Sequence, residues 1–239
     1  MSLSIIIPIY NEVEQLSYTI KKLQTLQKKN YNYELIFIDD FSNDGSYKKL
    51  IKFKKKYSKI KIYKNFKKGL GSAIKLGIEK SKNKYVCIFM CDLSDDVKDI
   101  NKYYKIIKNN QNLDAVLGTR FAKNSKVKNY PYLKLLLNRV ANNIIRILFL
   151  SKYNDFTNAF KIYKRTTLLK LFPIVSENFN VFLELPLKII TRKLNYKIIS
   201  INWYGRKIGE SKFKIKEVGS KYVFTMLYCL LEKILLNKR

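Results

Sequence analysis

The sequence predicts an α/β protein built on a doubly wound, mostly parallel sheet. Short β-rich apolar runs alternate with segments of helical periodicity through the first half of the chain, which is the pattern of successive β-α-β units. Several of these runs end abruptly in charged residues. The chain has 239 residues, of which 47% are apolar, so it can bury a sizeable core.

The first two predicted strands are both followed by polar motifs. Residues 3–8 form a β-rich run, and the helix expected after it has apolar residues at helical spacing: Leu16, Ile20, Leu23 and Leu26. Residues 35–38 form a second apolar run, which ends in Asp39 and Asp40. The next residues, 41–46, are rich in helix-capping and turn-forming types, so we expect a turn that leads into a helix.

A glycine-containing loop and an acidic loop follow the next strands. After a strand at residues 60–63, Gly69 and Gly71 open a helix beside two lysines. Such a helix start lets backbone N–H groups approach a phosphate, and simple turn geometry is the alternative. Two further apolar runs, 85–90 and 115–119, end in charged side chains: Asp92, Asp95 and Asp96 after the first, and Arg120 after the second.

These charged strand ends are expected to meet at one edge of the sheet. The carboxyl ends of parallel strands lie together, and ligands of open α/β sheets bind just beyond them. Carboxylates there can hold a hard divalent cation, which in turn binds phosphates, and an arginine adds a phosphate ligand. A solvated acidic turn is the alternative for each cluster alone, but the convergence of three favours a metal–diphosphate site.

The net charge, the absence of histidine and the small number of cysteines limit the classes of function that the chain can have. The chain has 48 Lys+Arg against 18 Asp+Glu, a net charge of +30, which indicates a polyanionic partner: nucleic acid, an anionic membrane or phosphorylated substrates. It contains no histidine, which excludes Ser-His or Cys-His catalysis and histidine metal sites. The three cysteines have no C-x-x-C spacing, so we expect reduced thiols and a cytoplasmic location. The N-terminus enters a predicted strand at once, so we expect no signal peptide.

Two amphipathic segments, residues 132–150 and 221–239, carry broad apolar faces with interspersed basic residues. Each is either a packed helix or a helix that lies in a membrane interface. Neither reaches the roughly 20 apolar residues of a spanning helix. Two such segments on a basic protein favour peripheral association with the cytoplasmic face of an anionic membrane.

The motifs together resemble family 2 glycosyltransferases, most closely the dolichol- or polyprenyl-phosphate mannosyltransferases and their bacterial relatives. The resemblance covers residues 3–215 and rests on segments in the family's order: Ile7–Glu12, Ile38–Ser46, Gly69–Gly71, Asp92–Ser94, Gly118–Arg120, Asp155–Thr157 and Arg206–Phe213. It implies a GT-A fold with a Rossmann-like sheet and C-terminal amphipathic helices. It also implies a GDP- or UDP-sugar donor, a Mg²⁺ or Mn²⁺ ion and a polyprenyl phosphate or other lipid-linked acceptor, as in cell-envelope glycan biosynthesis.

The resemblance assigns site residues by position. It implies a nucleoside site formed by Pro8, Tyr10, Glu12, Ile38 and Asp40, with Gly69 in the glycine loop nearby. Cys91 and Asp92 would lie beside the ribose and the metal–diphosphate, and the phosphates of donor and acceptor would be held by Arg120, Arg206 and Lys212. We expect residues 1–215 to form the glycosyltransferase domain, with a nucleotide-sugar half at 1–120 and an acceptor half at 121–215, followed by an amphipathic helix at 216–239.

The metal motif departs from the family. Its usual Asp-x-Asp reads Met90-Cys91-Asp92 here, and a thioether is a poor ligand for Mg²⁺ or Mn²⁺. We expect Asp92 to hold the metal with help from Asp95, Asp96 or the donor phosphates.

The expected reaction is transfer of a sugar to a polyprenyl phosphate by direct displacement, with inversion at the anomeric carbon. A phosphate acceptor needs no strong base. Transfer to a glycan hydroxyl is the enzymatic alternative, and the candidate bases for it are Asp95, Asp96 and Glu184. A buried ion pair is the alternative role of Glu184. A non-catalytic nucleotide-sugar-binding protein is a further alternative, whereas nucleic-acid binding explains the charge but not the carboxylate-tipped strands.

Overall fold

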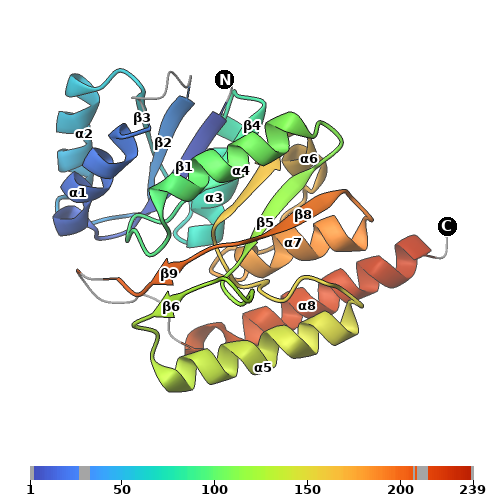
Figure 1. Ribbon diagram of the computed structural model, residues 1–239. Helices are drawn as coiled ribbons and strands as arrows, with labels where there is room; N and C mark the ends of the chain where they lie inside the picture. Colours follow the sequence, from blue (N-terminus) through green and yellow to red (C-terminus); the bar gives the residue numbers. More distant parts are fainter. Residues whose placement is uncertain (1–2, 27–32, 207, 209–214, 238–239) are drawn as a thin grey trace.

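A seven-stranded mixed sheet forms the centre of the molecule (Figure 1). The computed structural model describes residues 3–26, 33–206, 208 and 215–237. The strand order in the sheet is β3-β2-β1-β4-β7-β5-β8. The bounds of these strands are β1 Leu3–Ile9, β2 Tyr33–Asp39, β3 Ile60–Lys64, β4 Tyr85–Ile88, β5 Ala115–Thr119, β7 Lys161–Lys164 and β8 Tyr196–Ser200. A small second sheet pairs β6 (Val127–Lys128) with β9 (Trp203–Tyr204).

The sheet is mostly parallel, as the sequence predicts. Only β7 runs antiparallel to its neighbours β4 and β5, and the other pairs in the seven-stranded sheet are parallel. The sequence does not predict β7, because the strand is short and has a lysine at each end. The Lys161 side chain is nevertheless buried, and its ammonium donates to backbone carbonyls that include Phe156 O.

Helices cover both faces of the sheet. On one face Ile5 and Phe37 pack with residues of α1, α2 and α4, and on the other face Ile6 and Ile36 pack with α3, α6 and α7. Successive side chains of a strand point to opposite faces, so the apolar runs are buried on both sides. The helices are α1 Val13–Gln24, α2 Ser46–Lys56, α3 Leu70–Lys80, α4 Val97–Asn109, α5 Tyr132–Leu148, α6 Arg165–Lys170, α7 Val181–Thr191 and α8 Ile215–Asn237.

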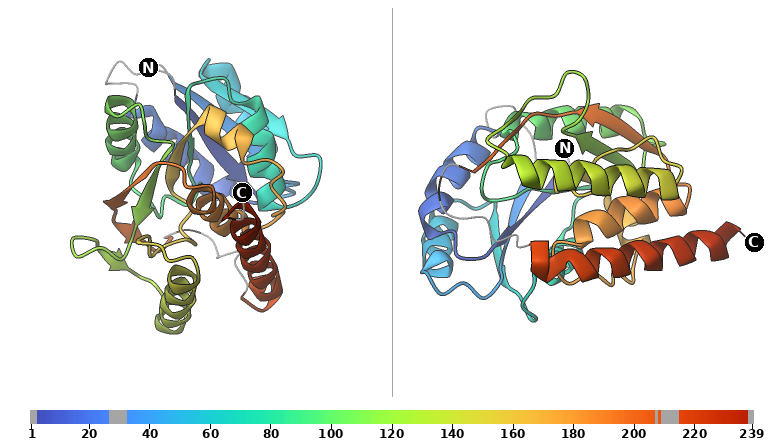
Figure 2. Two further views of the ribbon diagram at one scale, coloured as in Figure 1. Left: turned by 90° about the vertical axis from the view of Figure 1, so that its right-hand side faces the viewer. Right: turned by 90° about the horizontal axis from the view of Figure 1, so that it is seen from below.

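The two predicted amphipathic helices, α5 and α8, lie on the same side of the molecule. They run along the bottom of Figure 1 and face the viewer in the right-hand view of Figure 2, and α8 packs against α7. Both leave large apolar side chains exposed: Tyr132, Leu133, Leu136, Leu137, Val140, Ile144, Ile147 and Leu148 on α5, and Val223, Phe224, Leu227, Leu231, Ile234, Leu235 and Leu236 on α8. No helix in the described ranges combines the length and the apolar character needed to cross a bilayer.

The division of the chain at residue 120 stays a prediction. Strands β7 and β8, which come after this point, belong to the same sheet as β1 to β5. The α8 helix covers most of the segment 216–239 that we expected to be helical.

Candidate active site

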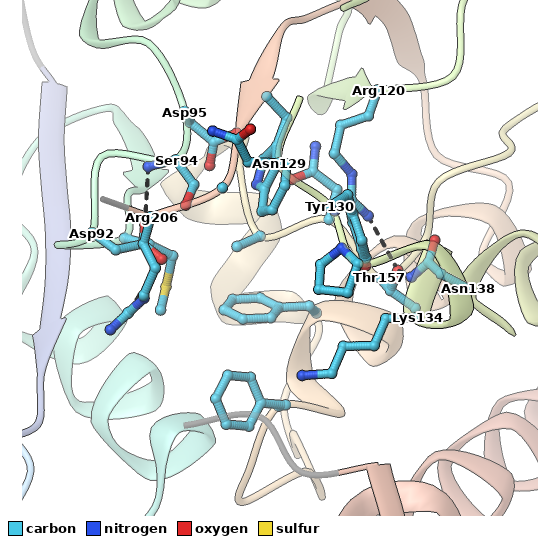
Figure 3. Close-up of a pocket in the computed structure, with 18 of the residues that line it drawn as sticks. Asp92, Ser94, Asp95, Arg120, Asn129, Tyr130, Lys134, Asn138, Thr157 and Arg206 are labelled. Atoms are coloured by element: carbon cyan, nitrogen blue, oxygen red, sulfur yellow. Dashed lines mark hydrogen bonds and ion pairs between the residues drawn. The ribbon is translucent and has the colours of Figure 1, made fainter. Parts of the chain in front are cut away.

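Two adjoining cavities lie where β1, β2 and β4 end. The first, which we call the β1 cavity, is lined by Pro8, Ile9, Tyr10, Glu12, Asp40, Lys68, Gly69, Leu70, Met90, Cys91, Asp92, Glu177, Asn178, Phe179, Arg206 and Lys221. The second, the β5 cavity, is lined by Met90, Asp92, Ser94, Asp95, Arg120, Asn129, Tyr130, Pro131, Lys134, Asn138, Thr157, Asn158, Ala159, Phe179, Phe182, Trp203, Gly205, Arg206 and Tyr222 (Figure 3). Four residues line both cavities: Met90, Asp92, Phe179 and Arg206. The cavities therefore form one continuous site with two compartments.

Arg206 and Asp92 meet at the border between the compartments. Nη2 of Arg206 lies 3.2 Å from Oδ2 of Asp92 and 3.1 Å from Oε1 of Glu12. Burial alone lowers the pKa of the Arg206 guanidinium, but the two carboxylates outweigh that effect and raise it. The other Asp92 oxygen, Oδ1, accepts the backbone N–H of Ser94 at 3.0 Å. A fixed positive charge thus lies between two carboxylates where the cavities join.

The turn that carries Glu12 is held by the polar motif after β2. The backbone N–H of Val13 donates to Oδ2 of Asp44 at 2.9 Å, and that of Glu12 donates to Oγ of Ser46 at 2.9 Å. Burial raises the pKa of Asp44, but the hydrogen bonds it accepts outweigh burial and lower it. These hydrogen bonds join residues that are 31 and 34 positions apart in the sequence, so the two motifs form one structure.

Asp40 fixes the glycine loop of the β1 cavity. Its Oδ1 accepts the backbone N–H of Gly69 at 2.8 Å and the side-chain amide of Asn65 at 2.8 Å. Gly69 has φ +144°, and a Cβ there would lie 2.3 Å from the carbonyl oxygen of Glu177. That same carbonyl accepts the N–H of Gly71 at 2.8 Å, at the start of α3. Local geometry and close backbone approach therefore account for both glycines, and this helix start is capped by the protein itself.

Arg120 and Asp155 form a buried, two-point ion pair on the wall of the β5 cavity. Nε and Nη2 of Arg120 donate to the two Asp155 oxygens at 2.9 and 2.7 Å, and the Arg120 backbone N–H donates to Oδ2 at 2.8 Å. Burial lowers the pKa of Arg120, but Asp155 outweighs it and raises the pKa. The ring centroids of Tyr130 and Trp203 lie 5.7 and 5.8 Å from the guanidinium carbon. Asp155, which belongs to the Asp155–Thr157 segment of the resemblance, thus holds the Arg120 side chain in place.

Asp95 is a buried carboxyl group on the same wall. It is 5% exposed, and its Oδ1 has no hydrogen-bond partner within the described structure. Burial, followed by the nearby charge of Asp92, raises its pKa to about 8, and Arg120 offsets only part of this. The surroundings of Asp95 therefore favour its neutral, protonated form over the carboxylate.

This environment gives a prediction for Asp95→Asn. The folded pKa of Asp95 lies near 8 against an ordinary value of 3.8, so the stability present below pH 4 is lost progressively as the pH rises toward 8. The amide cannot ionise, so we expect the free energy of unfolding of the variant to exceed that of the wild type by at least about 1 kcal/mol at pH 8.5, with a smaller difference at pH 5. Urea unfolding at both pH values measures this. A difference that does not depend on pH contradicts the assignment.

Several expected residues lie elsewhere. Ile38 is fully buried in the core, and Asp96 is an exposed N-cap of α4, where it accepts the N–H of Lys98 at 2.9 Å. Glu184 is fully buried and pairs with Lys188 at 2.9 Å, which is the buried ion pair that the sequence left open. None of the three lines either cavity, so we do not assign them to the site. Lys212 lies outside the described residues.

The other expected residues do line the cavities. Pro8, Tyr10, Glu12, Asp40, Gly69 and Cys91 line the β1 cavity, Asp95 and Arg120 line the β5 cavity, and Asp92 and Arg206 line both. The Cys91 thiol is buried, which raises its pKa, and its Sγ lies 3.7 Å from Oγ1 of Thr19. It is therefore a neutral wall residue.

Residues 4–172 match the family described as Glycosyl transferase family 2. The chain belongs to this family. It is 29% identical over 225 residues to a dolichol-phosphate mannosyltransferase of Pyrococcus furiosus, an alignment that covers 91% of this chain and 61% of that protein. It is 30% identical over 218 residues to a dolichyl-phosphate beta-glucosyltransferase of Dictyostelium discoideum, covering 84% of this chain and 66% of the relative. The chain spans less than two thirds of the length of both relatives.

A solved structure confirms the fold. The glucosyl-3-phosphoglycerate synthase from Mycobacterium tuberculosis, crystallised with Mn²⁺, uridine diphosphate and phosphoglyceric acid, matches 96% of this chain and 78% of its own with a TM-score of 0.74. The sequence identity is 16%, so the likeness concerns the fold alone. The GT-A fold expected from the motifs is therefore confirmed.

The residues at the border suit a metal–diphosphate only in part. Among the described residues no group of three Asp, Glu, Cys or His side chains could hold a metal ion, so Asp95 and Asp96 do not complete a site with Asp92. Mg²⁺ is commonly held by one or two carboxylates together with substrate phosphates, however. Asp92 fits that arrangement, with the phosphates of a bound nucleotide supplying further oxygens.

Sequence reasoning missed part of the site. Lys134 and Asn138 on α5 and Lys221 on α8 line the cavities, but on a chain with 48 basic residues a single lysine on a helix carries no distinguishing signal. The sequence predicts the amphipathic helices that carry these three residues, but only the fold shows that the helices lie beside the cavities.

Proposed function

We propose that the chain is an inverting glycosyltransferase that moves a sugar from a GDP- or UDP-sugar to a polyprenyl phosphate. The observation that carries this proposal is the pair of cavities that share Asp92 and Arg206. One compartment is suited to the nucleotide and the other to a phosphorylated acceptor, so their border is the place for the anomeric carbon. The curated relatives, named for transfer to dolichol phosphate, support the acceptor class.

The β1 cavity has the features of a nucleotide site. The ammonium of Lys68 lies 5.0 Å from the centroid of the Tyr10 ring, and both side chains line the cavity, which offers an aromatic face and a cation to a base and its phosphates. Lys221 and Arg206 add two further positive charges to this cavity, which Asp92 also lines. These residues would bind the diphosphate and stabilise it as it leaves.

A divalent cation would be held by Asp92 and the donor diphosphate. Such an ion supplies charge stabilisation to the leaving diphosphate. The protein's own cations, Arg206 and Lys221, would act on the same developing charge.

Met90→Asp tests this arrangement. The substitution adds a second carboxylate beside Asp92, and hard cations prefer oxygen ligands, so we expect the Mn²⁺ concentration needed for half-maximal transfer to fall about 10-fold. Titration of Mn²⁺ in the transfer assay, and calorimetry of Mn²⁺ with the nucleotide, measure this. Met90→Leu is the matched control and leaves the metal dependence unchanged. An equal response of both variants contradicts a metal site at Asp92.

The β5 cavity has the features of an acceptor site. Lys134 and Asn138 of α5 lie on the side of the cavity opposite Asp92 in Figure 3. Arg120 and Asn138 both donate to Oγ1 of Thr157, at 3.4 and 2.7 Å. A phosphate monoester is already ionised near neutral pH, so its attack on the anomeric carbon requires no general base. The positions of Asp96 and Glu184 outside the cavities are consistent with such an acceptor.

The α5 and α8 helices would bring the site to the surface of an anionic membrane. Both helices lie on the same side of the molecule, leave large apolar side chains exposed and contribute residues to the cavities. An acceptor with a long polyprenyl chain would then reach the β5 cavity from the lipid. We propose that this association is peripheral and on the cytoplasmic face, with a role in cell-envelope glycan synthesis.

Ile147→Glu combined with Leu231→Glu tests the membrane face. Each substitution places a charge on an apolar row, so we expect binding to vesicles that contain an anionic lipid to fall at least about 10-fold. Vesicle flotation measures this. Phe66→Glu changes a still more exposed apolar residue, in the loop between β3 and α3, and leaves binding unchanged. Wild-type flotation of the double variant, or a change only in oligomeric state by gel filtration, contradicts a lipid-facing role.

The donor is tested by binding. Thermal shifts of the wild type with UDP, GDP and their sugar derivatives, each with and without Mn²⁺, identify the nucleotide. We expect stabilisation by one nucleotide family that increases with Mn²⁺. Absence of stabilisation by every nucleotide sugar contradicts the proposed function.

A further inference from the structure

The wall of the β5 cavity beside Asp92 carries two buried polar groups that have no partner. Oδ1 of Asp95 and Oγ of Ser94 lack hydrogen bonds within the described structure, and both residues line the cavity. Asp95 is 5% exposed and Ser94 is 4% exposed. A buried polar group without a partner costs about 1–3 kcal/mol, and native proteins retain few of them without a reason. A bound ligand that supplies the missing hydrogen bonds is such a reason.

The backbone around these groups is fixed. The Ser94 N–H donates to Asp92, the Ser94 carbonyl accepts the N–H of Tyr204 at 2.9 Å, and Asp95 forms a β-bridge with Trp203. Ser94 and Asp95 are therefore anchored on both sides by backbone contacts. Side chains on such a segment are positioned before a ligand arrives, which limits the entropy lost on binding.

The charges around Asp95 select the kind of ligand. Burial raises the pKa of Asp95 most, the carboxylates of Asp92, Asp155 and Asp99 raise it further, and the Arg120 guanidinium lowers it. This excess of negative charge disfavours a phosphate directly over Asp95. The described residues also offer no group of three ligands for a metal ion. A neutral group with hydroxyls satisfies both constraints, because a hydroxyl can donate to or accept from a carboxyl group without adding charge.

The position relative to the nucleotide compartment identifies that group. Asp92 and Arg206, at the border, are where the diphosphate of the donor is proposed to lie. In Figure 3, Ser94 and Asp95 continue along the wall from Asp92 into the β5 cavity, on the side away from Lys134 and Asn138. A sugar attached to the diphosphate would extend along this wall, while the acceptor phosphate would occupy the basic side.

We propose that Asp95, together with Ser94, binds hydroxyl groups of the donor sugar and selects which sugar is transferred. This inference rests on the proposed function for the nucleotide compartment, but it does not depend on the identity of the acceptor. The role is binding and selection: Asp95 takes no proton from the acceptor. The two residues form a sugar subsite between the diphosphate and the acceptor.

Calorimetry tests the subsite without turnover. The wild type is titrated with UDP, UDP-glucose, GDP and GDP-mannose in the presence of Mn²⁺, and the ratio of Kd for the nucleotide to Kd for its sugar derivative is compared with that of Asp95→Ala, Asp95→Asn and Ser94→Ala. We expect Asp95→Ala to reduce this ratio at least about 10-fold for the preferred sugar, while the Kd of the nucleotide alone stays within about 2-fold. Asp95→Asn, which keeps the shape of the side chain, serves where Asp95→Ala does not fold. An unchanged ratio in the Asp95 variants overturns the inference.

Deoxy analogues of the sugar locate the contact. In the wild type, removal of one hydroxyl reduces affinity, and we expect that loss to disappear in Asp95→Ala, because the partner is then absent in both measurements. Equal losses for every deoxy analogue in wild type and variant overturn the inference.

If the sugar coupling at Asp95 is found but no label passes to polyprenyl phosphate, the proposed acceptor is wrong and the sugar subsite stands. If sugar binding is intact in Asp95→Asn while transfer to a hydroxyl acceptor is abolished, Asp95 is a general base and the inference fails.

Discussion

Asp92→Asn is expected to reduce the rate of sugar transfer by about 10³-fold. Within the described structure Asp92 is the only carboxylate that lines both cavities, and it pairs with Arg206 at their border. The amide binds a divalent cation weakly and no longer holds the guanidinium by charge. Removal of one preorganised electrostatic contact to the transition state commonly costs about 10²–10³ in rate, and loss of a metal ligand adds to this. Steady-state kinetics at saturating Mn²⁺ measure the effect.

The matched control is Asp99→Asn on α4. This carboxylate lines neither cavity, so kcat/KM should change less than about 3-fold. Near wild-type transfer by Asp92→Asn, with unchanged Mn²⁺ dependence, contradicts the placement of the diphosphate at the border.

Asp155→Ala is expected to lower the free energy of unfolding by about 3–5 kcal/mol. The side chains of Arg120 and Asp155 are 7% and 0% exposed, and the pair is joined at two points. Loss of one partner leaves an uncompensated buried charge, which is costly even where the intact pair adds little net stability. Urea unfolding at pH 7 measures the change. The variant should also lose transfer, because Arg120 lines the β5 cavity, where the acceptor is proposed to bind.

Glu177→Ala is the control for stability. Its ion pair with Lys67 is exposed, with side-chain exposures of 41% and 67%, and such pairs contribute about 0–1 kcal/mol. Equal stability losses for the two alanine variants contradict the structural role assigned to Asp155.

The first half of the fold was predictable because its strands and helices have clear periods. The apolar run 85–90, for example, has flanking polar or charged residues, and its strand Tyr85–Ile88 is buried on both faces, so pattern and burial agree. The second half lacked this agreement. Helix α7 contains Pro186 and the buried pair Glu184 and Lys188, and strand β7 contains the buried Lys161. Charged side chains that are paired inside the folded chain interrupt the hydrophobic pattern on which prediction depends.

The candidate site divides in the same way. Asp92 and Arg206, which the family resemblance singles out, line both cavities, whereas Ile38 does not, because strand alternation turns its side chain into the core. The sequence singles out Asp95 as an acidic residue, but only the fold shows that it is buried and that its Oδ1 has no hydrogen-bond partner within the described structure. Residues that α5 and α8 bring to the cavities, such as Lys134, depend on packing between distant segments.

The most direct test of the account is transfer of labelled sugar to polyprenyl phosphate, compared with polyprenol of the same length. Both lipids are supplied in anionic vesicles with Mn²⁺ and the nucleotide sugar identified by binding. We expect label in the lipid phase only with the phosphate, an inverted anomeric linkage in the product, and loss of both with Asp92→Asn. Transfer to polyprenol or to a glycan hydroxyl but not to the phosphate, or tight donor binding without transfer to any acceptor, would contradict the proposed reaction.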